Sequence, residues 1–199
     1  MQSLTIDERA WADYLITRAG LLIFCSLLLI AAFKVHPLFI EKDTSGMLDA
    51  RISHLASYLE GVDSTSVQRS YYYGFDIPED VKIGLSARYV TASTDKVPQM
   101  TRARALMTPV YPSNSLWNNR SGLMVAISDR CQGRTGIGGD LLLSSDWDRI
   151  RELLGEAEDE LSVDAFVPDI NQPLIVEKVI LNLQGPEGLE KRGITIVYQ

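Results

Sequence analysis

The clearest feature in the pattern of apolar and polar positions is an uncharged stretch of fourteen residues, from Gly20 to Phe33. Extended to residues 19–40, it would form roughly 33 Å of helix, which matches a hydrocarbon core of about 30 Å. Lys34 and His36 fall in the last turns of that window, where their polar ends can reach lipid headgroups. We therefore predict an N-terminal tail over residues 1–18 and a transmembrane helix over residues 19–40. The residues expected to form this anchor are Gly20, Leu21, Leu22, Ile23, Phe24, Leu27, Leu28, Leu29, Ile30 and Phe33.

A cleaved secretory signal is the alternative interpretation, because Arg18 precedes a short apolar run. The acidic residues Asp7, Glu8 and Asp13 before that run are unusual in an export signal, and no clear small-x-small cleavage site follows it. An uncut single-pass anchor is therefore favoured. Basic residues are balanced on its two sides, so the positive-inside rule leaves the orientation undecided.

Beyond the anchor, a helical period indicates an amphipathic helix over residues 44–60. Apolar residues recur there at spacings of four, three, four and three, which places them on one face. These residues are Leu48, Ile52, Leu55, Leu59 and Val62. Thr44 or Ser45 is expected to cap its start, and Gly61 to end it. With Pro37 between them, this helix and the anchor could form one kinked rod.

Strand-like patterns follow the amphipathic helix. Residues 66–75 and 81–93 are rich in Tyr, Val, Ile and Thr, and the turn-forming residues 76–80 between them predict a β-hairpin. Alternation from Val81 to Tyr89 predicts one buried and one exposed face. Residues 102–110 are also extended, whereas residues 122–127 fit a strand or a helix equally well.

The C-terminal part combines a helix with a second hairpin. Apolar positions of residues 146–161 share one helical face, and Ser145 with Asp148 matches a capping box. Residues 174–183 and 194–198 are rich in β-branched residues and predict a closing hairpin. The class expected is α+β: an N-terminal transmembrane helix, an amphipathic helix, and a mainly antiparallel sheet with one further helix. Residues 41–199 are expected to form one soluble domain.

Composition and motifs exclude several functions. The chain carries 26 Asp and Glu against 19 Lys and Arg, for a net charge of −7, which argues against a nucleic-acid partner. His54 and Cys131 are the only His and Cys after residue 41, too few for the usual zinc sites or for a disulfide within that domain. The glycine-rich residues 131–140 lack the end of a P-loop and favour a flexible loop over a phosphate site. No catalytic, cofactor-binding or metal-binding residue is predicted.

One tripeptide bears on location. Asn119-Arg120-Ser121 matches a glycosylation sequon in a polar loop, which makes Asn119 a candidate glycosylation site. It favours a cell-membrane protein whose soluble domain is extracytoplasmic.

The order of charged leader, apolar helix, amphipathic helix and sheet resembles that of archaeal type IV pilin-like membrane proteins. Arg18-Ala19-Gly20 is similar to the processing site of their leaders, which makes Gly20 a candidate processing site. Residues 77–85 resemble the turn and strand that often follow the first helix in such proteins. The resemblance covers about the first 95 residues. It implies an outward-facing domain and assembly through packed apolar helices rather than catalysis.

Two functions are therefore expected from the sequence. The first is a membrane-anchored structural or assembly protein at the cell surface. Its partners would be the lipid bilayer and other membrane or filament subunits, which would contact its N-terminal helix. The second is a membrane-tethered sensor or ligand-binding module, with the loop 133–139 and Trp117 lining its site. A membrane-bound hydrolase has no residues to support it.

Overall fold

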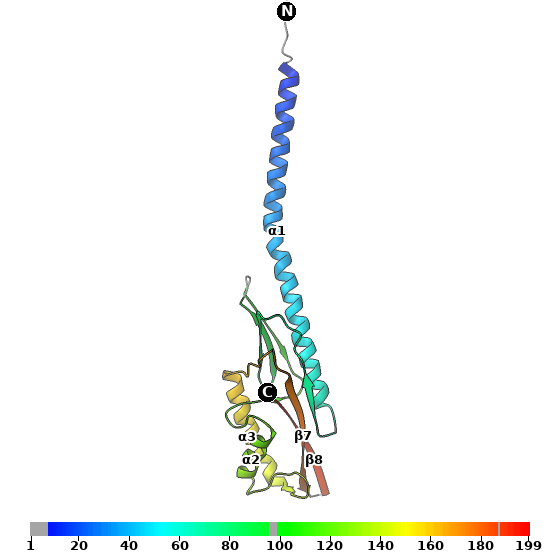
Figure 1. Cartoon of the computed structure of the whole chain (residues 1–199), viewed down its shortest axis with the longest axis vertical. Coiled ribbons are helices and arrows are strands. Elements are labelled where there is room, and N and C mark those ends of the chain that lie inside the picture. The colour runs from blue at the N-terminus through cyan, green and yellow to red at the C-terminus, as the bar shows by residue number, and fades with distance from the viewer. Residues whose placement is uncertain (1–7, 96–98, 187) are drawn as a thin grey trace, which may run out of the picture. The chain divides into compact units, whose positions relative to one another are not determined.

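The computed structural model describes residues 8–95, 99–186 and 188–199. The chain divides into two compact units, Met1–Thr44 and Ser45–Gln199. Helix α1 (Glu8–Asp63) contributes to both, and all other elements belong to the second unit. These are β1 (Arg69–Tyr73), β2 (Val81–Leu85), β3 (Tyr89–Thr94), β4 (Met100–Ala105), β5 (Tyr111–Pro112), α2 (Arg120–Arg130), β6 (Leu142–Leu143), α3 (Ser144–Val163), β7 (Leu174–Gly185) and β8 (Gly188–Tyr198) (Figure 1).

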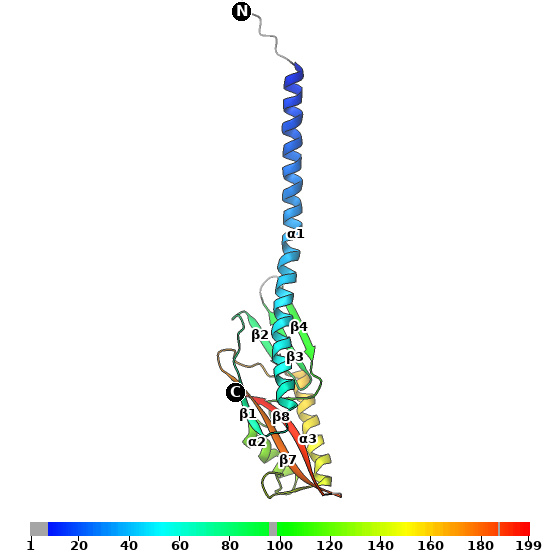
Figure 2. The same cartoon turned by 90° about the vertical axis from the view of Figure 1, so that its right-hand side faces the viewer.

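The described strands of the second unit form two sheets. The larger sheet has the order β1-β7-β8-β5, with β6 paired to β7. Its centre is the long antiparallel hairpin of β7 and β8, and β1 lies antiparallel beside β7 (Figure 2). The short strands β5 and β6 pair in parallel with β8 and β7. The smaller sheet is the antiparallel meander β2-β3-β4. The fold is therefore α+β and mainly antiparallel, as predicted.

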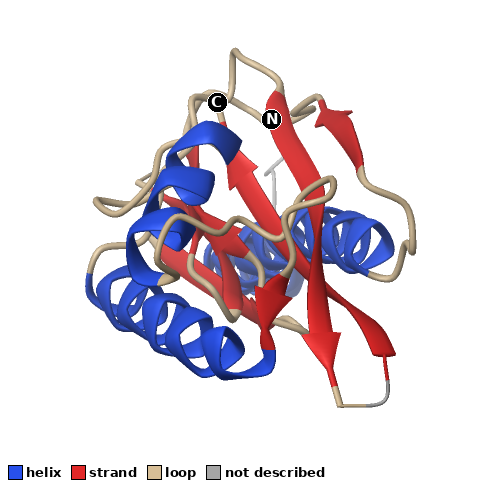
Figure 3. Ribbon diagram, turned by 90° about the horizontal axis from the view of Figure 1, so that it is seen from below, coloured by secondary structure: helices blue, strands red, loops and turns tan. Residues whose placement is uncertain are grey.

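Helices lie on both sides of the larger sheet (Figure 3). One apolar cluster joins the C-terminal part of α1 to the smaller sheet and to Leu174, Val176 and Val197. The other joins α2 and α3 to side chains of β7 and β8 that include Val179 and Ile194. Because successive strand residues point to opposite faces, residues 176–179 of β7 and 194–197 of β8 are buried on both faces.

The amphipathic helix is confirmed. Its five predicted apolar positions are all buried, with at most 4% of any residue exposed. The start is different, because α1 runs without interruption through residue 44 and needs no cap there. The Ser45 hydroxyl instead accepts hydrogen bonds from the guanidinium of Arg102, the shorter at 2.6 Å.

The first predicted hairpin is wrong. Strand β1 pairs with β7, whereas β2 pairs with β3, so the two halves of that hairpin belong to different sheets. The predicted second half is itself two strands, since the chain turns where Ser86 N donates to the Tyr89 carbonyl at 2.9 Å. Alternation therefore holds from Val81 to Ala87 and fails at Tyr89, which is 51% exposed.

The later elements agree better with the sequence. Residues 122–127 lie in helix α2, and the helix predicted over 146–161 is confirmed as α3. The closing hairpin is confirmed as β7 and β8. The cap of α3 differs from the predicted pair of Ser145 and Asp148, because Asp146 Oδ2 accepts from the backbone N–H of Leu143 at 2.8 Å.

The membrane prediction is wrong. Among the residues that the structure describes, no helix is long and apolar enough to cross a membrane. This overturns the transmembrane helix over 19–40 and the location in the cell membrane with an extracytoplasmic domain. The physical reason is length: the uncharged run between Arg18 and Lys34 spans about 22 Å of helix, short of a hydrocarbon core of about 30 Å.

Candidate functional site

The main feature of the first unit is an exposed apolar segment, defined here as residues 20–33 of α1. Its nine large side chains are each 54–78% exposed. They are those of Leu21, Leu22, Ile23, Phe24, Leu27, Leu28, Leu29, Ile30 and Phe33. Consecutive helix residues are about 100° apart, so Leu21 to Phe24 already cover the whole circumference. The segment is therefore apolar on every side.

Small residues interrupt the apolar segment without making it strongly polar. Cys25 is a free, exposed cysteine. The neighbouring Ser26 hydroxyl donates to the Leu22 carbonyl at 2.8 Å, which satisfies its hydrogen-bonding donor within the helix. Gly20, the candidate processing site, lies within α1. Its cleavage stays a prediction.

In the second unit, the chemistry centres on two neighbouring charged residues of β7. Glu177 and Lys178 are both buried, although they lie in the middle of an apolar strand. Because adjacent strand residues face opposite ways, each has a separate set of partners. The sequence contains a signal for these residues, namely two consecutive charges inside the apolar residues 174–183. The prediction of a closing hairpin did not take these charges into account.

Lys178 joins the end of α1 to the sheet. Its Nζ lies 2.5 Å from Asp63 Oδ1 and donates to the Asp63 carbonyl at 2.7 Å, so the ammonium also caps the C-terminus of α1. The Thr195 hydroxyl donates to the same carboxylate at 2.6 Å. Burial pushes the pKa of Asp63 upward, but the hydrogen bonds from Lys178, Thr195 and Thr108 outweigh it and lower that pKa.

Gly193 of β8 makes room for the Lys178 side chain. A Cβ at this position would come within 2.9 Å of Lys178 Nζ and still closer to its Cε. We therefore predict that Gly193→Ala displaces the ammonium from Asp63 and destabilises the protein by about 2–3 kcal/mol, because a buried carboxylate loses its partner. Chemical denaturation measures this loss.

Gly185 is the matched control for Gly193. It lies in the same hairpin, and its Cβ would meet Glu190 Oε1 at 2.6 Å, the end of a side chain that is 45% exposed and can move away. Gly185→Ala should cost much less. Equal losses of stability in the two variants would show that Gly193 is not needed to make room for the Lys178 side chain.

Glu177 lies in a second polar cluster. Its carboxylate pairs with Arg120 Nη1 at 3.1 Å and accepts from the Tyr198 hydroxyl at 2.9 Å. Burial, followed by the hydrogen bond to Glu177, raises the pKa of Tyr198 to about 12, so this phenol stays protonated at neutral pH. The side chains of Glu177, Arg120 and Tyr198 therefore all have a partner within this cluster.

Asn119 begins helix α2. Its side-chain oxygen accepts from the backbone N–H of Gly122 at 3.0 Å, the geometry of an N-cap. Capping is a sufficient structural reason for an Asn at this position. Glycosylation of Asn119 stays a prediction.

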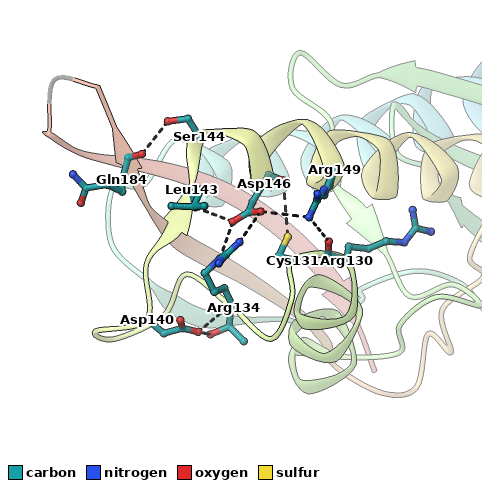
Figure 4. Close-up of polar contacts among 10 residues, drawn as sticks. Arg130, Cys131, Arg134, Asp140, Leu143, Ser144, Asp146, Arg149 and Gln184 are labelled. Atoms are coloured by element: carbon teal, nitrogen blue, oxygen red, sulfur yellow. Dashed lines mark hydrogen bonds and ion pairs between the residues drawn. The ribbon is translucent and has the colours of Figure 1, made fainter.

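The glycine-rich loop is tied down rather than flexible (Figure 4). The guanidinium of Arg134 donates to both carboxylate oxygens of Asp146, at 3.0 and 3.2 Å, and Asp146 is 1% exposed. Burial pushes the pKa of Asp146 upward, but the bonds from Arg134 and Leu143 outweigh it and lower that pKa. Asp140 Oδ2 accepts from the N–H and hydroxyl of Thr135. Arg134 is thus a structural residue.

The ligand site predicted at loop 133–139 and Trp117 is not formed in this geometry. Trp117 is 3% exposed in the core, and Arg134 is held by Asp146. Two acidic residues of α3 are also engaged, since Glu156 pairs with Arg130 and Glu160 accepts from Ser115. Within the described chain, no group of three or more His, Cys, Asp and Glu residues is placed to hold a metal ion.

Comparisons with known proteins identify no relative of this chain. A scan against protein-family models, a search of curated proteins and a search of solved structures each found no match to this chain.

Proposed function

We propose that this protein is a structural subunit that assembles through the apolar segment, residues 20–33, packed among the same helix of other copies. The observation that supports this function is the exposure of nine large apolar side chains around the full circumference of α1. A helix that is apolar on all sides is stable in water only when it is buried on all sides.

The shape of this surface decides what kind of partner fits it. One neighbouring helix covers a stripe, as in a two-stranded coiled coil. Two or more neighbours are needed to cover an apolar circumference. Other copies of the chain supply helices of the same length and apolarity. A homomeric bundle is therefore the simplest assembly that buries the whole segment.

The free energy gained by burying the segment is comparable to the cost of association. Fully burying a Leu, Ile or Phe side chain contributes about 1.5–3 kcal/mol. Covering nine side chains that are a little over half exposed is then worth on the order of 10 kcal/mol per chain. Association costs about 4–15 kcal/mol in lost freedom. The resemblance to archaeal pilin-like proteins, which implies assembly through packed apolar helices, supports the same function.

The test is the oligomeric state of the full chain in detergent-free buffer, measured by sedimentation equilibrium. We expect a mass of at least three chains for the native protein. Leu22→Glu combined with Leu29→Glu should reduce it to one chain, because two charges cannot be buried in an apolar bundle. Met107→Glu is the matched control, since this side chain is 88% exposed in the second unit and lies outside the segment. It should leave the mass unchanged.

Cys25 gives an independent readout of the same assembly. It lies in the middle of the segment, so parallel packing of copies brings Cys25 thiols close together. In a Cys131→Ala background, a short bismaleimide should yield covalent dimers, and the double Glu variant should abolish them. A native chain that is monomeric without detergent, or that associates only with lipid vesicles, would contradict the proposal.

A further inference from the structure

A cavity with a volume of about 450 Å³ lies at the open edge of β8 in the second unit. Strand β5 covers this edge only at Ile196 and Val197, where it pairs with β8. Beyond that pairing, Gly193 and Ile194 line the cavity directly. Ligand sites in proteins commonly have volumes of about 300–1,000 Å³. The cavity is therefore large enough for a small molecule.

The edge of β8 presents peptide groups to this cavity. In an antiparallel pair, alternate residues direct their N–H and C=O groups toward the partner strand or away from it. Val197 directs its carbonyl away from β7, because that carbonyl accepts from Ser113 N at 2.7 Å. Gly193 lies four residues earlier in the same regular ladder. Its peptide groups therefore point outward as well.

The charged side chains that line the cavity are already paired inside the protein. Lys178 binds Asp63, and Glu158 is paired with the guanidinium of Arg88. Arg151 is paired with Asp148. Among these pairs Lys178 and Asp63 are largely buried, so a charged ligand that displaced either partner would leave a buried charge without its counter-ion, which costs free energy.

The groups of the cavity that are left to contact a ligand are uncharged. The apolar residues that line the cavity include Trp147, Leu154 and Ile194. Tyr111 is 8% exposed and also lines the cavity. Burial, followed by the charge of Glu158, raises the pKa of Tyr111, so its hydroxyl is protonated at neutral pH and can donate.

We propose that this cavity is a binding site for a small uncharged molecule with an aromatic ring and one hydroxyl or amide group. The ring packs against Trp147 and Leu154. The polar group bonds to the Tyr111 hydroxyl or to the peptide groups of Gly193. This site differs from the one predicted from the sequence at loop 133–139, and it is independent of the assembly through residues 20–33.

Gly155 allows the site to be filled without disturbing the fold. It lies inside helix α3 and lines the cavity, and a Cβ there would meet no atom within 4 Å. Gly155→Leu therefore places a side chain in the cavity without a clash at Cβ and also favours the helix. Gly46 is the matched control, because it is another helix glycine with open space around it but does not line the cavity.

The experiment uses ligand-observed saturation-transfer NMR on the full chain. Benzyl alcohol and benzamide are the uncharged probes, and benzoate and benzylammonium are their charged counterparts. We expect saturable binding of both uncharged probes, with Kd values at least tenfold lower than those of the charged ones. Gly155→Leu should raise these Kd values at least tenfold, and Gly46→Leu should leave them unchanged.

Three results would overturn this site: uncharged probes that fail to saturate, charged probes that bind as tightly, or an unaltered Kd in Gly155→Leu. The melting temperature of Gly155→Leu, expected to equal or exceed that of the native chain, excludes misfolding as the cause of lost binding. The Leu22→Glu and Leu29→Glu chain should bind the probes normally. Failure of assembly and failure of binding are therefore distinguishable.

Discussion

Lys178→Met is expected to lower the free energy of unfolding by about 3–5 kcal/mol at pH 7, because it leaves the Asp63 carboxylate buried without its cation. The side chains of Lys178 and Asp63 are 8% and 16% exposed, so water replaces the lost ammonium poorly. Met keeps most of the volume of the Lys stem. The loss therefore reports the charge and its hydrogen bonds, and urea denaturation measures it.

Lys82→Met is the matched control for this substitution. Lys82 pairs with Asp95 at 2.6 Å, but the two side chains are 65% and 68% exposed. Exposed ion pairs contribute little to stability. A similar loss for Lys82→Met and Lys178→Met would contradict the role of the buried pair.

The pH dependence separates the charge from packing. In the native protein the pKa of Asp63 is lowered below its unfolded value of about 3.9, so its contribution is present above that pH and is lost as the pH falls. Without Lys178, we expect burial to raise that pKa. The penalty of Lys178→Met should then be smaller at pH 4 than at pH 7. A penalty that does not change with pH would indicate lost packing alone.

Asp146→Asn is expected to cost about 2–3 kcal/mol at pH 7, because a buried carboxylate that accepts from Arg134 and Leu143 is replaced by a neutral amide. The folded pKa of Asp146 is lowered, so its stabilisation is full above about pH 5 and declines as the pH falls below about 4. The difference between native and variant proteins should therefore shrink in acid. Thermal unfolding at pH 7 and pH 3 measures it.

Asp148→Asn is the matched control on the same helix. Asp148 pairs with Arg151, but its side chain is 66% exposed. It should change stability little at either pH. If Asp146→Asn has an equally small effect, the glycine-rich loop is not held by this ion pair.

Sequence patterns predict helices here better than they predict the pairing of strands. The spacing of Leu48, Ile52 and Leu55 predicts their burial, because a helix repeats every 3.6 residues whatever it packs against. The same holds for α3. The pairing of β1 with β7 was missed, because partners in a sheet lie about a hundred residues apart and alternation does not identify them.

The partners of Glu177 and Lys178 were not predicted for a related reason. Lys178 finds Asp63 from a distant part of the chain, and Glu177 finds Arg120 and Tyr198. The sequence signal was two charges inside an apolar strand, which predicts partners but cannot name them. The cavity at the edge of β8 was also missed, because its lining residues come from α1, α3, β5, β7, β8 and the segment before β5.

By itself the sequence determined the local elements with a strong period, the α+β class and the apolar character of residues 20–33, since these depend on neighbouring residues. It led to a wrong membrane assignment, because extending that run to 19–40 included Lys34 and overstated its apolar length. Only the tertiary structure decided strand pairing, the two faces of β7 and the anchoring of the glycine-rich loop. The physical reason is that contacts between distant residues depend on packing and on the desolvation of charges, which no local pattern records.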